Sequence, residues 1–98
     1  MQFLVIARIV SQTPPTFELV QEEASVAFGY QQDGSVRSIH FIKDESGQIV
    51  LGAVLLFEAT KLSIVQDLVA ALPFIRERIA EAEIITLHPF TGYDAIIC

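Results

Sequence analysis

Two histidines and one glutamate are the first candidates for proton transfer in this sequence. His40 lies in a segment of mixed apolar and polar residues, His88 precedes a proline after an apolar segment, and Glu23 lies in a segment of helical periodicity. A neutral imidazole exchanges protons near pH 7, and a positioned carboxylate serves equally well as a general base. Each also has a structural interpretation. His40 would be an interface residue, His88 a partner of a main-chain carbonyl, and Glu23 a solvated side chain.

Arg8, Arg37 and Tyr30 are the candidates for binding a ligand, because a guanidinium holds a carboxylate through two parallel hydrogen bonds. Arg8 lies within an apolar strand segment, where an unpaired charge is costly. Alternatively, Arg8 lies at the end of the strand, where its side chain reaches water or pairs with Glu58. Arg37 begins an expected edge strand, where a charge also discourages aggregation. Tyr30, like Tyr93, places a hydroxyl at a cavity rim or packs as an amphipathic side chain.

Metal and cofactor motifs are absent from the sequence. The histidines and the single cysteine, Cys98, are far apart, without the His-x-His, Cys-x-x-Cys or Glu-x-x-His spacing of metal sites. There is no Gly-x-Ser-x-Gly elbow, P-loop or Gly-x-Gly-x-x-Gly. We therefore expect no metal and no cofactor. Glu22 and Glu23 are adjacent, so on a helix they point about 100° apart and do not form a carboxylate pair on one face.

The composition indicates one small domain, residues 1–98, that associates with itself. Apolar residues make up 52% of the chain, and the net charge is −6. The negative charge argues against nucleic-acid binding. No apolar run approaches the roughly 20 residues of a membrane span, and the N-terminus has no signal-peptide pattern. We expect a cytoplasmic protein without a membrane partner. The excess of apolar residues in a small chain indicates an oligomer interface.

The N-terminal part of the sequence predicts a strand followed by a helix. Gln2–Val10 is apolar on both faces of a strand, and Ser11–Pro15 breaks it. Prolines are tolerated in the first turn of a helix, so a helix can begin near Thr13 and end at Asp33-Gly34. The expected core side of this helix follows a spacing close to 3.6 residues and comprises Phe17, Val20, Ala24, Ala27 and Phe28.

The remaining sequence predicts two strands, a helix and a final strand. Val36–Ile42 and Ile49–Phe57 are joined by a polar hairpin loop with Gly47. Ser63 to Gln66 fits a capping box at the start of the second helix. Its expected core side comprises Ile64, Leu68, Ala71 and Leu72, and a connector, Phe74–Ala80, leads to the last strand, Glu83–Leu87.

This order predicts an α+β fold of the ferredoxin-like β-α-β-β-α-β type, a sandwich with two helices on one face of a four-stranded antiparallel sheet. Right-handed crossovers place the first and third strands in the centre and the other two at the edges. The uncovered face of such a sheet would expose more apolar surface than monomers usually tolerate. We therefore expect a homodimer, or a higher oligomer, whose sheets face each other and can enclose a small cavity.

Three short motifs resemble the muconolactone isomerase family of dimeric α/β barrels. They are Gly34-Ser35-Val36-Arg37, Leu72-Pro73-Phe74 and Leu87-His88-Pro89, and the element order matches over almost the whole chain. The segments Gly47–Gly52 and Leu55–Ala59 also look like the YciI-related branch. The resemblance implies a dimeric α/β barrel and carries over Arg37 and His88 as site residues. The chain lacks the tryptophan of the family's second strand and the helix-borne histidine of YciI relatives.

Three functions remain open from the sequence. The first is binding of a small carboxylate or lactone-like molecule in a cavity at the sheet face. The second is a cofactor-free isomerase of the muconolactone type, in which Arg37 or Arg8 anchors a carboxylate and His88, His40 or Glu23 moves the proton. The third is a non-catalytic homodimerisation module. The sequence does not decide whether the protein is an enzyme.

Overall fold

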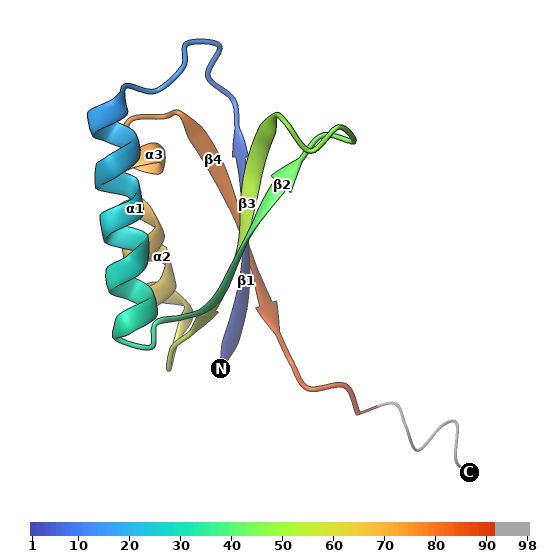
Figure 1. Cartoon of the computed structure of the whole chain (residues 1–98). Coiled ribbons are helices and arrows are strands. Elements are labelled where there is room, and N and C mark those ends of the chain that lie inside the picture. The colour runs from blue at the N-terminus through green and yellow to red at the C-terminus, as the bar shows by residue number, and fades with distance from the viewer. Residues whose placement is uncertain (92–98) are drawn as a thin grey trace.

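The computed structural model describes residues 1–91 as a single sheet with its helices on one face (Figure 1). The elements follow the predicted order with one short addition, the helix α3. They are β1 (Gln2–Ile9), α1 (Phe17–Gln32), β2 (Val36–Lys43), β3 (Val50–Glu58), α2 (Leu62–Ala70), α3 (Pro73–Arg76) and β4 (Ala80–Leu87). The antiparallel sheet has the order β2-β3-β1-β4. This confirms the ferredoxin-like fold and the central position of β1 and β3.

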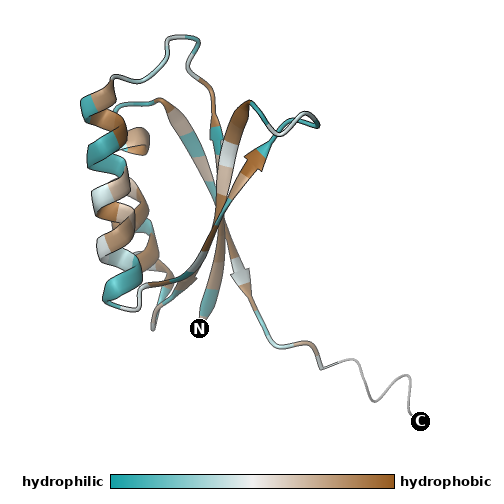
Figure 2. Ribbon diagram, in the orientation of Figure 1, coloured by the Kyte–Doolittle hydropathy of each residue, from teal (hydrophilic) through white to brown (hydrophobic). Residues whose placement is uncertain are grey.

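The hydrophobic core lies between the sheet and α2. Phe3 pairs with Phe57 and Val5 with Leu55 across the two central strands, and all four side chains are buried. Val65 and Val69 of α2 cover them. Because side chains alternate along a strand, the even-numbered residues of β1 face away from the helices. Hydrophobic residues recur along the length of the strands (Figure 2), and the register places them on both faces.

Helix α1 begins later than predicted and does not bury its apolar side. Thr16 is the N-cap, and its side-chain oxygen accepts a hydrogen bond from the Leu19 N–H at 3.2 Å, so both prolines precede the helix. The predicted core stripe is wrong: Phe17 is 71% exposed, Phe28 is 60% exposed, and no residue of α1 is buried. The physical reason is that α1 lies over a cavity, so its apolar residues face open space rather than packed side chains.

The second half of the chain differs from the predictions in local detail. Helix α2 is preceded by Lys61 as N-cap, without a side-chain capping bond, so the predicted capping box at Ser63 is wrong. Burial of Val65 and Val69 sets the rotation of this helix, which leaves Ile64 37% exposed. The connector contains α3, which begins at a proline as a first helical turn allows. Strand β4 begins three residues earlier than predicted, because Ala80 and Ala82 pair with β1.

The sheet face opposite the helices is apolar. Among residues 1–91, no helix covers this outer face, since α1, α2 and α3 all lie on the other side (Figure 1). The register places aliphatic side chains of the two central strands and of β4 together there, namely Leu4, Ile6, Val54, Leu56, Ile85 and Leu87. The outer face is therefore available for association with another molecule.

Candidate functional site

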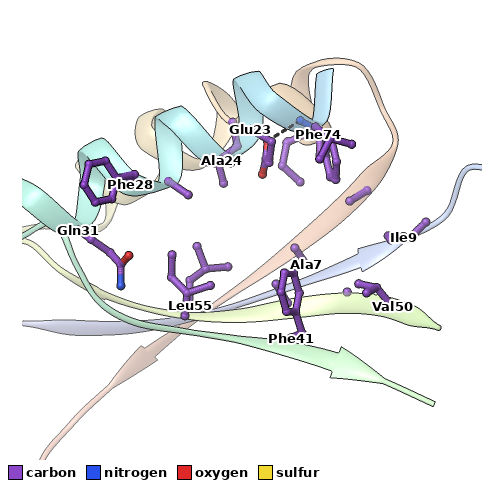
Figure 3. A pocket seen from close by; sticks show the side chains of 18 residues that line it. Ala7, Ile9, Glu23, Ala24, Phe28, Gln31, Phe41, Val50, Leu55 and Phe74 are labelled. Atoms are coloured by element: carbon purple, nitrogen blue, oxygen red, sulfur yellow. Dashed lines mark hydrogen bonds between the residues drawn. The ribbon is translucent and has the colours of Figure 1, made fainter. Parts of the chain in front are cut away.

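A cavity of about 610 Å³ lies between α1 and the sheet. This volume is within the range of small-molecule sites. Its floor is formed by the ends of β1, β2 and β3 beyond the packed core, its roof by α1, and one end by the residues around α3 (Figure 3). The lining is almost entirely apolar and includes Ala7, Ile9, Val20, Ala24, Ala27, Phe28, Ile39, Phe41, Leu55 and Phe74.

Glu23 is the only ionisable side chain among the residues that line this cavity. It extends from α1 toward α3, and its Oε2 accepts a hydrogen bond from the main-chain N–H of Phe74 at 2.9 Å (Figure 3). Burial raises the pKa of Glu23 above its usual value, although the Phe74 N–H opposes this by stabilising the carboxylate. The nearby charges of Glu22 and Arg76 act in opposite directions on the same pKa. A carboxyl group with a raised pKa in an apolar cavity is suited to accept and return a proton.

Gln31 is the second polar side chain of the cavity. It lies two helical turns beyond Glu23 and points from α1 toward the sheet (Figure 3). The rise of an α-helix separates their backbones by about 12 Å. The cavity therefore has a carboxyl group toward one end and, toward the other, an amide that can donate or accept a hydrogen bond.

Ion pairs connect α1 to α3 beside Glu23. Arg76 donates from Nη1 to Oε1 of Glu22 at 3.0 Å and from Nη2 to Oε2 of Glu22 at 3.3 Å. Its Nε donates to Oε2 of Glu77 at 2.9 Å. These pairs raise the pKa of Arg76 further above its already high value. The guanidinium therefore links the two helices at the end of the cavity where Glu23 lies.

Tyr30 has a structural position rather than a place in the cavity lining. Its hydroxyl donates to the carbonyl oxygen of Leu68 at 2.7 Å, which ties the C-terminal half of α1 to α2. Its ring meets the ring of Phe57 edge-on, with the centroids 6.1 Å apart. Burial raises the pKa of the Tyr30 hydroxyl. The hydroxyl is thus engaged by the main chain, and Tyr30 is not among the cavity residues.

Arg8 and His40 lie on the outer face of the sheet. Arg8 is opposite Gly52, and its Nη1 is 3.5 Å from Oε1 of Glu83, with the Arg8 side chain 61% exposed. It does not pair with Glu58, which instead faces the N-terminal amino group at 4.0 Å. His40 is exposed and opposite Val54. Neither side chain reaches the cavity, which is on the helix-covered face.

Arg37 and His88 are also separate from the cavity. Arg37 is exposed in the irregularity of β2 between Val36 and Ser38, and within residues 1–91 its side chain makes no hydrogen bond or ion pair. His88 is exposed and follows β4, where the chain leaves the body of the domain (Figure 1). Tyr93 and Cys98 lie outside the described residues. Of the six predicted site residues, the structure thus places only Glu23 in the cavity.

The cavity itself was not predicted from the sequence, which indicated a cavity between two facing sheets. One signal was available: Ala24 and Ala27 are small residues on the side of α1 that faces the sheet, and small side chains leave space there. Gln31 was also missed, because a polar residue near the end of a helix is usually solvated. In the part of the chain that the structure describes, no group of three His, Cys, Asp or Glu residues could hold a metal ion. Within the same residues, the helices are too short or too polar to cross a membrane.

Solved structures with this fold include the following two. Muconolactone isomerase is 18% identical in sequence, with a TM-score of 0.74 over 94% of this chain and 93% of that chain. The 5-chloro-2-hydroxyhydroquinone dehydrochlorinase of Burkholderia phenoliruptrix AC1100, in complex with 2,5-dihydroxybenzoquinone, is 13% identical, with a TM-score of 0.65 over 94% and 98% of the two chains. No protein-family model matches the sequence, and no curated protein matches it. The resemblance to muconolactone isomerase is thereby confirmed for the fold.

Proposed function

We propose that this protein binds a small, neutral, ring-containing molecule between α1 and the sheet, and that Glu23 moves a proton on it. The observation that carries this proposal is the single carboxyl group in an otherwise apolar cavity of about 610 Å³. An apolar cavity with one or two placed polar groups is typical of small-molecule sites. The two proteins of the same fold are named for an isomerase and a dehydrochlorinase activity on small cyclic compounds, which supports a ligand of this size.

A neutral ligand suits the cavity better than the carboxylate expected from the sequence. No arginine, lysine or histidine lines the cavity, and the one ionisable group there becomes negative on ionisation. A ligand carboxylate would lose its hydration without gaining a basic partner, and it would be repelled by ionised Glu23. Arg8 and Arg37, the expected anchors, lie elsewhere. The favoured ligand therefore has a carbonyl or hydroxyl group but no charge.

The chemistry that this arrangement supports is a proton shift next to a carbonyl group. The Glu23 carboxylate removes a proton from a carbon beside the ligand carbonyl, and the electrons of that C–H bond delocalise into the carbonyl. The same carboxyl group then returns the proton to a different carbon of the conjugated system, so no redox partner is needed. Gln31 can donate its amide N–H to the carbonyl oxygen while that oxygen carries negative charge. The Phe74 N–H holds Glu23 in place throughout.

A neutral unsaturated lactone tests this proposal. α-Angelica lactone has no carboxylate and isomerises by such a proton shift to β-angelica lactone, whose C=C bond is conjugated with the carbonyl, so ultraviolet absorbance follows the reaction directly. We expect the wild-type protein to accelerate this reaction and Glu23→Gln to lose the acceleration, because glutamine cannot accept the proton. Muconolactone should be the poorer substrate.

Arg37→Ala is the matched control for the lactone experiment. Its side chain is exposed and outside the cavity, so we expect its rate to equal that of the wild type. Turnover that persists in Glu23→Gln would contradict the assignment of the proton to Glu23. Turnover of muconolactone that is lost in Arg37→Ala would instead support the carboxylate-anchoring role of Arg37.

We also propose that the protein is a homodimer that associates through the outer face of the sheet. The aliphatic side chains of that face, with Leu4 and Leu56 at its centre, have no cover within residues 1–91. Association there would leave each cavity intact, because the cavity lies on the opposite face of the sheet. It would also bring Arg8 and His40 into the interface. A homodimer without catalytic activity is the alternative function if no ligand binds.

Light scattering of Leu4→Lys tests the dimer. A charge at the centre of an apolar interface should give a folded monomer, whereas the wild type should have the mass of a dimer. Ile64→Lys, on the exposed side of α2, is the control and should remain dimeric. A monomeric wild type at micromolar concentration would contradict the proposal.

A further inference from the structure

Helix α1 is held in place by polar contacts at its inner edge and by the packing of the Tyr30 ring against Phe57. None of its residues is buried. Toward its middle, Glu22 and Glu23 contact α3, and near its C-terminus the Tyr30 hydroxyl contacts the main chain of α2. The residues of α1 that line the cavity lie in the same stretch of the helix as these contacts, between Val20 and Gln31. The direction of the Glu23 side chain therefore depends on contacts that fix the rotation of α1 about its own axis.

We propose that Arg76 is a positioning residue for Glu23, acting through its paired contact with Glu22. This inference rests on the proposed role of Glu23. Glu22 and Glu23 are consecutive in a helix and point about 100° apart. A rotation of α1 that turned Glu23 away from the cavity would also carry Glu22 out of reach of Arg76. The guanidinium thus fixes the carboxyl group that it does not itself bind.

The geometry at Arg76 is specific to a guanidinium. Two of its nitrogens meet the two oxygens of Glu22, at 3.0 and 3.3 Å, and its third nitrogen meets Glu77 at 2.9 Å. A planar fork with two parallel bonds fixes an orientation, whereas a lysine ammonium acts as a single charge. Both side chains of the Arg76–Glu22 pair are about half exposed, so the pair contributes little to the free energy of unfolding. Its effect is on orientation more than on stability.

Helix α3 presents both contacts to α1 from one short turn. The Phe74 N–H binds Glu23, and two residues later Arg76 binds Glu22. Pro73 begins this turn and is buried, which fixes its place against the domain. The two contacts reinforce each other, because each holds α1 at the same rotation and the same distance from α3.

The amide proton of Phe74 provides a measurement that does not depend on catalysis. When a carboxylate accepts its hydrogen bond, the amide shift follows the ionisation of that carboxyl group. In NMR titrations of the wild type, the Phe74 amide should therefore change with the same pKa as the side-chain carboxyl carbon of Glu23. The groups whose charges act on Glu23 are Glu22 and Arg76, and Tyr30 senses the charge of Glu23.

Arg76→Gln and Glu22→Gln separate orientation from charge. Both break the paired contact, so both should abolish the pH-dependent shift of the Phe74 amide. Their electrostatic effects on Glu23 are opposite, because Arg76 lowers the pKa of Glu23 and Glu22 raises it. Arg76→Lys keeps the charge but should not restore the shift. The control is Arg78→Gln, which makes the same charge change at an exposed position and should leave the shift unaltered.

The outcomes are decisive for the role of Arg76. Loss of the Phe74 shift in both glutamine variants of the pair supports the positioning role. Retention of the wild-type shift in Arg76→Gln, or its restoration in Arg76→Lys, overturns it. Absence of lactone turnover in the wild type would contradict the proposed activity but would not affect the NMR result. Failure of the proposed activity and failure of the positioning role of Arg76 are therefore distinguishable.

Discussion

Replacing Gly52 or Gly29 by alanine should change stability in opposite directions. Gly52 is buried in the central strand β3, and a Cβ there would overlap the carbonyl oxygen of Ala7 and lie 3.1 Å from the Arg8 Cα. These are backbone atoms of β1, which is itself paired on both sides, so they cannot move away freely. Overpacking of this kind costs about 1–3 kcal/mol or more. Gly29 lies inside α1 with no atom within 4 Å of an added Cβ, so alanine should stabilise the helix by about 0.5–1 kcal/mol.

Urea unfolding of the two variants, at one protein concentration, measures both changes in the free energy of unfolding. The free energies of unfolding of the two variants should therefore differ by about 1.5–4 kcal/mol or more, which is the sum of the overpacking cost and the gain in helix propensity. A stable Gly52→Ala protein would refute the close approach of β1 and β3 at the cavity floor. A destabilised Gly29→Ala protein would show that this side of α1 is covered, contrary to its open position.

Three further predictions concern the roof and contents of the cavity. Tyr30→Phe keeps the ring beside Phe57 but removes the hydrogen bond to the Leu68 carbonyl, so thermal unfolding should show a loss of about 1 kcal/mol, or roughly 4–8 °C for a domain of this size. The pKa of Glu23 is raised in the folded state above its usual value of 4.5. The protonated carboxyl group therefore contributes to the free energy of unfolding below pH 4.5, and this contribution is lost as the pH rises through the folded pKa. The free energy of unfolding of the wild type should therefore fall relative to that of Glu23→Gln as pH increases from 4 to 7, and a parallel pH dependence of the two proteins would contradict the raised pKa. Ala24→Leu should fill part of the cavity and abolish binding of an apolar fluorescent dye without loss of stability, and unchanged dye binding would show that the dye binds elsewhere.

The order and pairing of the strands were predictable because they depend on local features of the sequence, namely the apolar runs of the strands and the residues of the turns. Alternating and continuous apolar runs marked β1 and β3, and Gly34 and Gly47 adopt the positive φ values that their turns require. Helix rotation was less predictable. In α2 the inward residues are Val65 and Val69 rather than Ile64, since several apolar residues compete for one buried side and only packing decides among them.

The site was predicted only in part, because its residues are defined by a space rather than by a motif. Glu23 was identified as a candidate from its place beside the apolar side of α1, but nothing local showed that α1 would lie off the sheet. Arg8 and Arg37 matched carboxylate chemistry in type, yet Arg8 is on the outer face and Arg37 is exposed at an irregular edge of β2. Residue type alone does not tell which face of a doubly apolar sheet contains the cavity.

The two faces of the sheet differ in what they offer another molecule. The outer face offers aliphatic surface near its centre, which suits association, and two of its charged residues, Arg8 and Glu83, pair with each other. The inner face is packed against α2 at one end and open beneath α1 at the other. The Phe74 N–H belongs to the first turn of α3, where main-chain amides lack partners within the helix, and the Glu23 carboxylate accepts its hydrogen bond. This bond to α3, together with the paired contact of the preceding glutamate, indicates that α1 is oriented to keep this one carboxyl group facing the cavity.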